Sequence, residues 1–328
     1  MALLLSRGDL ARLLDFERVI DTVGAAFAAY SGGRTQTPLR VGVEPPGTTG
    51  VLLAMPAAVA EPKALGAKIV SVFRDNAARG LPTVHSVYVL SDYETGAPLA
   101  IMDGGYLTAL RTAAGSASAT RYLARPEART LGVFGTGMQA RFHVETIRRV
   151  RRLDSVVVSG SSPDKTRAFA DWVEQATGLT AQAASPEVTS AADVVAACTT
   201  SQTPVVIAES VHQGAHVNAV GAFTPSTREL PSALVRRAGV YVDSRAGACA
   251  EAGDLLLAVR DGAFALSEIA GELGEVILGK VVGRTSAHAV TIYKSVGAAF
   301  LDAATAQLAF EEARRNGAGT AYDFAAEQ

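Results

Sequence analysis

The chain has 328 residues and a mass of 33.9 kDa, about twice the usual size of a single domain, so its length favours two domains. Its 30 Lys and Arg residues against 32 Asp and Glu residues leave a net charge of −2, with no basic segment long enough to follow a phosphate backbone, which argues against nucleic acid as a partner. Hydrophobic residues make up 48% of the chain, enough for a sizeable core, but no run of them approaches the ~20 that cross a bilayer, which argues against a membrane.

The cysteines and the first residues bear on the compartment. Cys198 and Cys249 lie in runs that look buried, and two cysteines are too few for a disulfide framework or a zinc cluster. The apolar run from Met1 to Leu5 is too short for the core of a signal peptide. We therefore expect a soluble protein of the reducing cytoplasm.

In chain order, the first third of the sequence predicts a helix and then a mostly antiparallel sheet. From Ser6 to about Tyr30 apolar residues recur at intervals of three and four, the spacing of an amphipathic helix, which we expect to end at Gly32-Gly33. Residues 107–123 have the spacing of another helix, and Arg125-Pro126 marks a break after it. Between these helices lie short β-rich runs divided by Pro and Gly, at 40–43, 51–55, 65–73, 86–90 and 98–102.

From Arg129 strand-like and helix-like segments alternate. Because two parallel strands cannot be joined by a tight turn, this alternation predicts a doubly wound Rossmann domain. A helix from Ser295 to about Arg315 ends the pattern, and we expect it to pack on the first domain. The predicted fold class is therefore α/β, with a discontinuous α+β domain of residues 1–117 and 298–328 and a Rossmann domain of residues 118–297. The predicted strands are 131–134, 156–158, 194–198, 217–220, 240–242 and 289–293, and the predicted helices between them are 138–150 and 164–177.

A glycine turn lies directly after the strand at 131–134. The first glycine of such a turn allows a tight bend, the second lets the backbone approach a pyrophosphate, and a small sixth residue lets helix and strand pack closely. The N-terminus of the following helix offers unpaired N–H groups to the phosphates. A glycine-rich turn can also be no more than a turn, but this strand–turn–helix context favours dinucleotide binding. The turn reads Gly135-Thr136-Gly137-Met138-Gln139-Ala140.

The end of the next predicted strand bears on the choice of dinucleotide. It reads Ser159-Gly160-Ser161-Ser162, with no carboxylate to bind the 2′-hydroxyl of NAD. Asp164 follows, but it is more simply an acid in the first turn of a helix. We therefore predict NADP(H) as the preferred cofactor, with NAD(H) as the alternative. The residues that can surround a 2′-phosphate, or else merely cap and solvate the helix, are Ser161, Ser162, Lys165 and Arg167, and Ser159 is a further cofactor-binding candidate.

Three basic side chains lie in apolar or small surroundings. Arg40 begins a predicted strand, Lys68 lies within Leu-Gly-Ala-Lys-Ile-Val, and Arg111 lies in a run of Leu, Thr and Ala. A cation in such a setting is costly unless an anion meets it. Each can pair with an internal carboxylate or extend to the surface, and periodicity alone does not bring the three together.

Short motifs are spread over nearly the whole chain. Besides the glycine turn, they are GAKIV at 66–70, LPTVH at 81–85, MDG at 102–104, LTALRTAA at 107–114, DS at 243–244 with EAGD at 251–254, GELGEV at 271–276 and TIYKSVG at 291–297. Together and in this order, they resemble the motifs of the ornithine cyclodeaminase and mu-crystallin family. The resemblance implies a homodimer whose first domain supplies the dimer sheet and the substrate pocket, together with a Rossmann domain that binds the cofactor.

The resemblance also implies roles for single residues. Arg40, Lys68 and Arg111 bind the substrate carboxylate, and Lys68 can donate or relay a proton. Guanidinium groups and a lysine in a dry site suit these tasks, because the first offer paired donors and the second shifts its pKa readily. His85 lines the pocket, with a satisfied core histidine as the alternative. The remaining cofactor residues are Thr112, Thr199 and Ser295, the last of which lies near the nicotinamide or caps the final helix.

Two carboxylates that cyclodeaminases carry are missing. By the same resemblance an aspartate is expected at Ala222 or Phe223, and a glutamate is expected just before Met55-Pro56, where residues 52–54 are Leu-Leu-Ala. A basic second amine of the substrate would lack its partner there, at a cost of about 2 kcal/mol or more in a dry site. Reduction of an imine requires less, namely an anchored carboxylate, a protonated imine and a hydride donor.

We therefore predict an NAD(P)H-dependent oxidoreductase that reduces 2-imino acids to L-amino acids, preferably Δ1-pyrroline-2-carboxylate or Δ1-piperideine-2-carboxylate. The alternatives are an ornithine or lysine cyclodeaminase, an alanine-type dehydrogenase, and a non-catalytic ligand-binding protein. We predict no metal site: His212 and His216 have helix-like spacing, but Gly214 lies between them and a strand follows.

Overall fold

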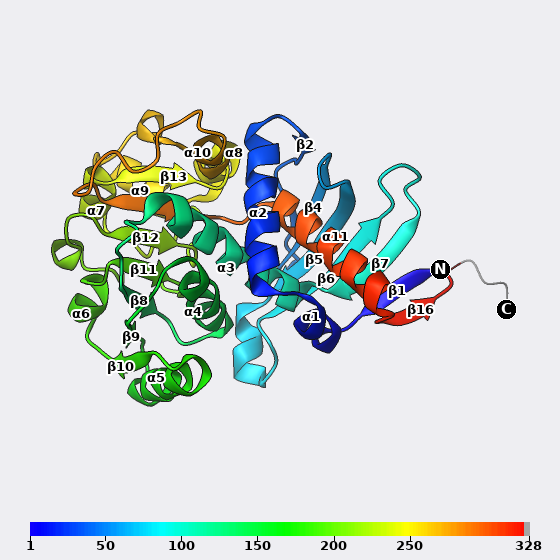
Figure 1. Ribbon diagram of the computed structural model, residues 1–328, viewed down its shortest axis with the longest axis horizontal. Helices are drawn as coiled ribbons and strands as arrows, with labels where there is room; N and C mark the ends of the chain where they lie inside the picture. The colour runs from blue at the N-terminus through cyan, green and yellow to red at the C-terminus, as the bar shows by residue number, and fades with distance from the viewer. Residues whose placement is uncertain (325–328) are drawn as a thin grey trace. The chain divides into compact units, whose positions relative to one another are not determined.

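The computed structural model describes residues 1–324, which divide into two compact units (Figure 1). Unit 1 consists of Met1–Arg111 and the segment that begins at Ala298, and unit 2 consists of Thr112–Gly297. Within the described residues each unit is built on its own eight-stranded sheet, and helices pack against both sheets. The predicted α/β fold class is confirmed.

Two helices begin unit 1 where the sequence predicts one. α1 (Arg7–Leu13) and α2 (Phe16–Ser31) are separate because Asp15 is extended and its side chain accepts a hydrogen bond from the Arg18 N–H at 3.0 Å. An aspartate in this position caps the next helix better than it continues the previous one. α2 ends at Gly32, as predicted.

The sheet of unit 1 has the order β16-β1-β7-β6-β5-β4-β2, and β3 pairs with β4. The five predicted runs are strands β3 to β7, and they pair with one another in antiparallel fashion, as predicted. The apolar start of the chain is also a strand, which pairs in parallel with β7 and which the sequence pattern did not predict. The strands are β1 (Ala2–Leu5), β2 (Thr35–Gln36), β3 (Val41–Val43), β4 (Val51–Val59), β5 (Ala64–Val72), β6 (Val84–Ser91), β7 (Pro98–Asp103) and β16 (Thr320–Tyr322), and the 3-10 helix η1 (Arg74–Arg79) lies between β5 and β6.

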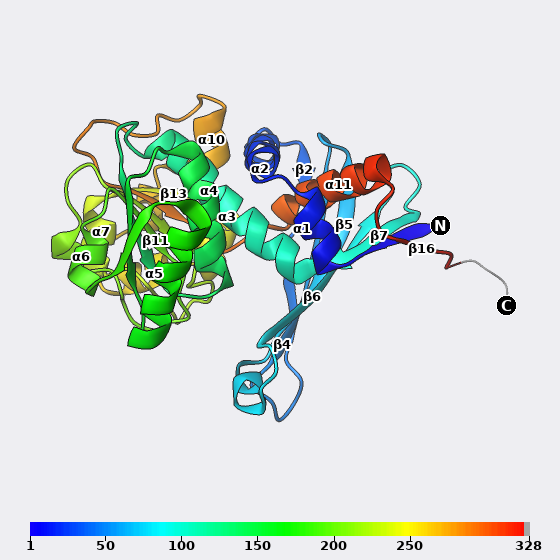
Figure 2. The same cartoon turned by 60° about the horizontal axis from the view of Figure 1, so that its bottom comes forward.

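One face of this sheet is covered by α11 (Ala299–Asn316), beside which α2 packs (Figures 1 and 2). The strand register places Met55, Lys68 and Tyr88 opposite one another on the covered face. Because side chains alternate along a strand, Val87 and its cross-strand neighbours lie on the other face. The register therefore divides the sheet into a face under α11 that carries Lys68 and an opposite face that α11 does not cover.

Two long helices begin at positions that differ from the prediction. α11 begins at Ala299 rather than at Ser295, because the carboxylate of Asp243 accepts hydrogen bonds from the Ser295 hydroxyl and from the N–H groups of residues 296 and 297 and holds them in an irregular turn. α3 (Gly104–Leu123) begins three residues before the predicted start, because Asp103 accepts a hydrogen bond from the N–H of residue 106 at 2.6 Å.

Unit 2 contains a sheet with the order β10-β9-β8-β11-β12-β15-β13-β14, and all its described pairings are parallel. The predicted strands are present, and the last of them inserts between β12 and β13. The short edge strands β10 and β14 were not predicted. The strands are β8 (Thr130–Phe134), β9 (Ser155–Ser159), β10 (Thr180–Ala183), β11 (Val194–Ala197), β12 (His216–Ala219), β13 (Gly239–Val242), β14 (Gly271–Glu272) and β15 (Thr291–Lys294).

Helices cover both faces of this parallel sheet, so its strands are buried on both sides. Along β11, Val194 and Ala196 belong to the hydrophobic core on one face of the sheet, and Val195 and Ala197 belong to the core on the other face. No helix in the described part of the chain is long and apolar enough to span a membrane. The helices are α4 (Met138–Val150), α5 (Pro163–Thr177), α6 (Pro186–Ser190), α7 (Ser232–Arg237), α8 (Arg245–Glu251), α9 (Gly253–Arg260) and α10 (Leu273–Ile277), with 3-10 turns η2 (Ala208–Ser210) and η3 (Leu266–Glu268).

Candidate active site

Two of the three predicted cations of unit 1 meet at one buried carboxylate. Asp302 Oδ2 lies 2.9 Å from Lys68 Nζ, and Asp302 Oδ1 accepts a hydrogen bond from Arg111 Nε at 2.8 Å. The three residues come from β5, α3 and α11, and none of them is more than 3% exposed. We call these three residues the cation cluster. Sequence reasoning found both cations but missed Asp302.

The cation cluster carries one uncompensated positive charge. Burial lowers the pKa of Lys68 to about 8; the Asp302 carboxylate raises it, and the charges of Arg111 and Arg40 lower it. Burial would raise the pKa of Asp302, but the two cations hold it below its usual value, so Asp302 is ionised. Because a buried excess charge is costly unless an anion meets it, the cluster suits an anionic ligand.

The other two candidates of unit 1, Arg40 and His85, differ in whether they act on the cluster. Arg40 is half-buried before β3, and its charge acts on Lys68. His85 is exposed on β6 and pairs in register with Ser71, so it lies on the sheet face opposite Lys68 and does not join the cluster; nor is it a core histidine. The structure thus brings Arg40, Lys68 and Arg111 within electrostatic reach and leaves His85 apart.

Two uncharged side chains complete the surroundings of Lys68. Thr108 Oγ1 accepts a hydrogen bond from Lys68 Nζ at 3.2 Å. Tyr88 lies beside Lys68 on β6 with its ring fully buried, and its hydroxyl has no hydrogen-bond partner within the described residues. Gly66 makes room for this ring, because a Cβ there would lie 2.7 Å from it. A Tyr hydroxyl in this position can donate to a ligand.

The positions of the missing cyclodeaminase carboxylates are apolar in the structure as well. Ala222 is buried, Phe223 packs against the core of unit 2, and residues 52–54 lie on β4. Glu229 is the buried acid nearest in sequence to Ala222, but its two oxygens accept hydrogen bonds from the Thr199 N–H at 2.6 Å and the Gly221 N–H at 2.7 Å. Glu229 is therefore committed to holding two loops and is not free to bind a substrate amine.

The glycine turn of unit 2 has the geometry that a pyrophosphate needs. Gly135 has a left-handed φ of 104°, and its N–H donates to the Ser159 carbonyl at 2.9 Å. Gly137 is the N-cap of α4 and supplies no side-chain cap, and the positive end of a helix dipole at this position suits an anion. A Cβ at Gly137 would meet no heavy atom within 4 Å among the described residues, which leaves space for a phosphate against the backbone. The turn fits a dinucleotide.

The serines at the end of β9 differ in how they are used. Ser159 is buried, Ser161 is exposed, and Ser162 caps α5 by accepting a hydrogen bond from the Lys165 N–H at 3.4 Å. The Arg167 guanidinium bonds to the Asp164 carboxylate within the first turn of α5. Ser161 and the exposed Lys165 side chain are thus the groups with the most freedom to meet a ribose substituent.

Three further cofactor candidates lie in unit 2. Thr112 is half-buried on α3, and the Thr199 hydroxyl at the end of β11 donates to Glu229 Oε1 at 2.7 Å. Burial and the nearby Asp254 carboxylate raise the pKa of Glu229. Ser295 does not cap α11, since its hydroxyl donates to the buried Asp243 at 2.8 Å. The alternative prediction that Ser295 caps the final helix is therefore wrong.

The histidines considered for a metal have other partners. Both ring nitrogens of the buried His216 face side chains, Thr291 Oγ1 at 2.9 Å and Asn218 Oδ1 at 3.2 Å. His212 lies against the carbonyl of residue 213. The described residues contain no group of three or more His, Cys, Asp or Glu side chains that could hold a metal ion.

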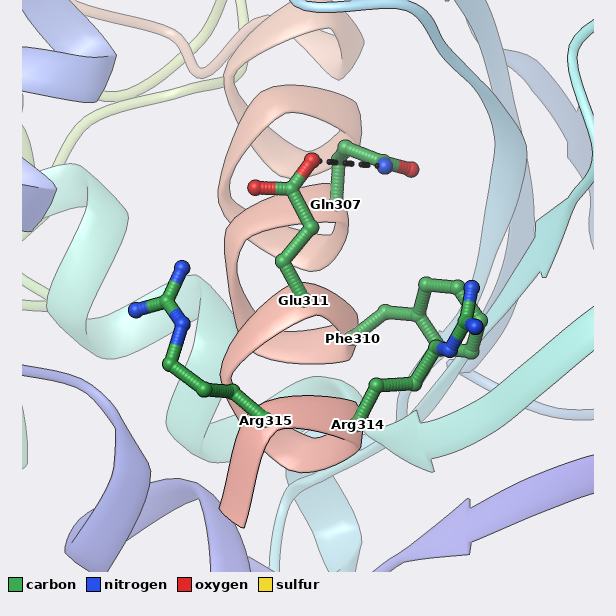
Figure 3. A pocket seen from close by; sticks show the side chains of 5 residues that line it. All are labelled: Gln307, Phe310, Glu311, Arg314 and Arg315. Carbon is green, nitrogen blue, oxygen red and sulfur yellow. Dashed lines mark hydrogen bonds between the residues drawn. The ribbon is translucent and has the colours of Figure 1, made fainter. Parts of the chain in front are cut away.

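A surface pocket in unit 1 lies along α11 (Figure 3). Gln307 Nε2 donates to Glu311 Oε1 at 2.9 Å, and the Arg314 guanidinium lies 5.8 Å from the centre of the Phe310 ring. Most of its polar groups are thus paired along the helix itself, and no residue of the cation cluster lines it. The pocket is lined by Gln307, Phe310, Glu311, Arg314 and Arg315.

Fold and site together define a two-domain protein with a Rossmann unit and a second unit that holds a buried cation cluster. The chain belongs to the ornithine cyclodeaminase/mu-crystallin family, whose model matches residues 2–317. The family assigned from the sequence motifs is confirmed.

Three similar proteins are informative. The chain is 37% identical over 325 residues to Δ1-pyrroline-2-carboxylate reductase of Bacillus cereus, covering 98% of this chain and 100% of that protein. A solved structure of Thermococcus litoralis Δ1-pyrroline-2-carboxylate reductase with NADH and L-proline matches with a TM-score of 0.94 and 36% identity over 98% and 100% of the two chains. An archaeal alanine dehydrogenase, described as a dimer with bound NAD, matches with a TM-score of 0.93 and 34% identity over 98% and 99%.

Proposed function

We propose that this protein is an NAD(P)H-dependent reductase of 2-imino acids and that its substrate is a cyclic ketimine, Δ1-pyrroline-2-carboxylate or Δ1-piperideine-2-carboxylate, which it converts to the L-amino acid. The observation that carries this proposal is the buried excess positive charge at Lys68, Arg111 and Asp302. Its support from relatives is the 37% identity to a reductase of this kind over the whole length of that enzyme.

Each cation has a task in this reaction. Arg111 and Arg40 bind the substrate carboxylate, because a guanidinium offers paired donors to its two oxygens. The Lys68 ammonium donates a proton to the imine nitrogen and keeps the C=N bond electrophilic. The glycine turn would hold the nicotinamide dinucleotide through its backbone, and the reduced cofactor would supply the hydride for this chemistry. The product amine retains the proton that Lys68 gives, and Lys68 regains one from solvent.

The apolar positions favour reduction over cyclisation. A diamino acid would present a second, charged amine, and neither Ala222, Phe223 nor residues 52–54 offers it a carboxylate. Glu229 is occupied by backbone N–H groups. A cyclic imine has no second amine and therefore requires no carboxylate at either of these positions.

For the cofactor we propose a preference for NADP(H). The end of β9 lacks the carboxylate that binds the 2′-hydroxyl of NAD, and Ser161 and Lys165 are exposed beside it. Initial rates measured separately with NADPH and with NADH test this preference, and a higher kcat/KM with NADH would contradict it.

We also propose that two copies associate through the sheet of unit 1. On the face opposite α11 the register aligns Val43 with Leu52 and, further along, Val41 with Ala54, Ile69 and Val87. Val41, Val43 and Val87 are 63%, 59% and 45% exposed, which is unusual for apolar side chains on neighbouring strands. In a closed two-fold dimer, the same face of a second chain would cover these valines.

For the compartment we propose the cytoplasm. Both cysteines are free thiols, and Cys249 is exposed, contrary to the expectation that it is buried. An exposed free thiol persists in a reducing environment.

A rate assay decides the function. The purified protein is mixed with NADPH or NADH and with each cyclic imine in turn, and with pyruvate plus ammonia as the linear case. We expect nicotinamide oxidation with a cyclic imine and a loss of about 100-fold or more in Lys68→Met. Absence of oxidation with every imine contradicts the proposal. Ammonia release from ornithine would indicate a cyclodeaminase. Oxidation with pyruvate plus ammonia but with neither cyclic imine would indicate an alanine dehydrogenase, and binding without turnover would indicate a ligand-binding protein.

A further inference from the structure

Asp302 holds two cations through its two different oxygens. Oδ1 bonds to Arg111 on α3, and Oδ2 pairs with Lys68 on β5. The carboxylate lies at 0% exposure on α11, so it contacts these cations without screening by water. Three elements that are distant in sequence are therefore fixed to one another at this side chain.

We propose that Asp302 is the positioning residue of the substrate site: it orients Lys68 and Arg111 and leaves the cation cluster with a single net positive charge, which one substrate carboxylate neutralises. This inference rests on the proposed function. It adds a residue that touches neither substrate nor cofactor and that sets how the two cations meet them.

The geometry at Arg111 supports the orienting role. Within the described residues, its hydrogen bond to the protein is made by Nε, at 2.8 Å from Asp302. A guanidinium held through Nε still presents the edge formed by its two terminal nitrogens, which is the edge that binds a carboxylate in bidentate fashion. Asp302 thus fixes the plane of the group while leaving its substrate-binding edge available.

The geometry at Lys68 supports the same role. An ammonium has three N–H donors, and Lys68 Nζ contacts Asp302 Oδ2 at 2.9 Å and Thr108 Oγ1 at 3.2 Å. At least one donor therefore remains for the imine nitrogen. The negative charge of Asp302 also raises the pKa of Lys68 against the effects of burial and Arg111, which keeps the ammonium protonated up to about pH 8.

The test is the titration of Lys68 in Asp302→Asn, followed by NMR of protein labelled with ¹³C-lysine. The chain has five lysines, so the Lys68 signal is assigned by its loss in Lys68→Arg. We expect the midpoint of Lys68 to fall by roughly 1 pH unit or more, because a neighbouring opposite charge shifts a pKa by about 1–3 units. An unchanged midpoint would overturn the proposal.

A matched control lies on the same helix. Glu312 is also an acid of α11, 6% exposed and paired with Arg18 and Arg315. Glu312→Gln removes a nearly buried ion-paired carboxylate and is expected to leave the Lys68 midpoint unchanged. A shift of equal size in Glu312→Gln would show a general effect of weakened packing and would overturn a specific role for Asp302.

Kinetics of the same variants test the orienting role. In Asp302→Asn we expect KM for the imine to rise by about tenfold or more and the alkaline limb of kcat/KM to move to lower pH. If that variant does not fold, Asp302→Glu keeps the charge but displaces it, and we expect a raised KM with the Lys68 midpoint retained. Unchanged KM and an unshifted alkaline limb in Asp302→Asn would contradict the proposal, and so would an unchanged KM in Asp302→Glu.

The two proposals fail in different ways. The NMR titration requires no substrate, so it reports on Asp302 even if no imine is reduced. Failure of the wild-type protein to oxidise NAD(P)H with any imine counts against the proposed function, whereas an unshifted Lys68 midpoint in Asp302→Asn counts against Asp302 alone.

Discussion

At the scale of single residues, Gly137 offers the sharpest test of the cofactor site. Its φ of −87° is accessible to alanine, and a methyl group there would meet no heavy atom within 4 Å among the described residues. We expect Gly137→Ala to change the free energy of unfolding by less than about 0.5 kcal/mol. The affinity for NADPH should nevertheless fall about tenfold or more, because the methyl group occupies the space through which a pyrophosphate approaches the backbone. Urea unfolding and a fluorescence titration with NADPH measure the two quantities.

Gly132 is the matched control for Gly137. It lies on β8 a few residues earlier, and a Cβ there would stand 2.1 Å from the Thr189 carbonyl oxygen. Gly132→Ala should therefore destabilise the fold by about 1–3 kcal/mol through overpacking. An unchanged NADPH affinity in a folded Gly137→Ala variant would contradict the assignment of this turn to the cofactor.

The residues of the cation cluster differ in what the sequence says about them. Lys68 and Arg111 could be predicted, because a cation within an apolar run is conspicuous. Asp302 could not, since it is one acid in an alanine-rich helix and its partner Arg111 lies 191 positions away. Local spacing contains no information on a pairing of that separation, so only the folded chain reveals why the two cations can be buried.

At the scale of elements, α4 packs against α3 through a buried histidine. His143 Nε2 lies 2.9 Å from the Ser116 hydroxyl, and Nδ1 lies 2.8 Å from the Gln139 carbonyl. Burial lowers the pKa of His143 from 6.5 to about 4. Protonation then favours the unfolded chain, so the contribution of His143 to stability is complete above pH 6.5 and is lost as the pH falls from 6.5 to 4, up to about 3 kcal/mol.

Fluorescence of Trp172 can follow this loss, because it is the single tryptophan of the chain and lies in unit 2. We expect the urea midpoint of the wild-type protein to fall between pH 6.5 and 4. His143→Gln should be less stable at pH 7 and should show a shallower fall over that interval, since the group that titrates has been removed. Identical slopes in the two proteins would contradict a neutral, buried His143.

The elements also show which parts of the fold a sequence pattern contains. α4 occupies Met138–Val150 as predicted, because its apolar residues repeat over several turns. β1, at Ala2–Leu5, was missed because four residues cannot show a period and its partner β7 lies almost a hundred residues away. The division between α1 and α2 was missed although Asp15 signals it, since an N-cap residue within a continuous apolar period is outweighed by that period.

At the scale of the whole molecule, the uncovered face of the unit 1 sheet predicts the oligomeric state. Val41 on β3 points away from α11 and is exposed, so replacing it should disturb association and leave the fold of one chain unaffected. We expect the wild-type protein to sediment as a dimer and Val41→Asp to sediment as a monomer, because each chain would then bury a carboxylate in an apolar contact. Val188→Asp, at a valine of unit 2 that is 49% exposed, should remain a dimer. If Val41→Asp is a dimer, the interface lies elsewhere. A monomeric wild-type protein would contradict the proposed dimer itself.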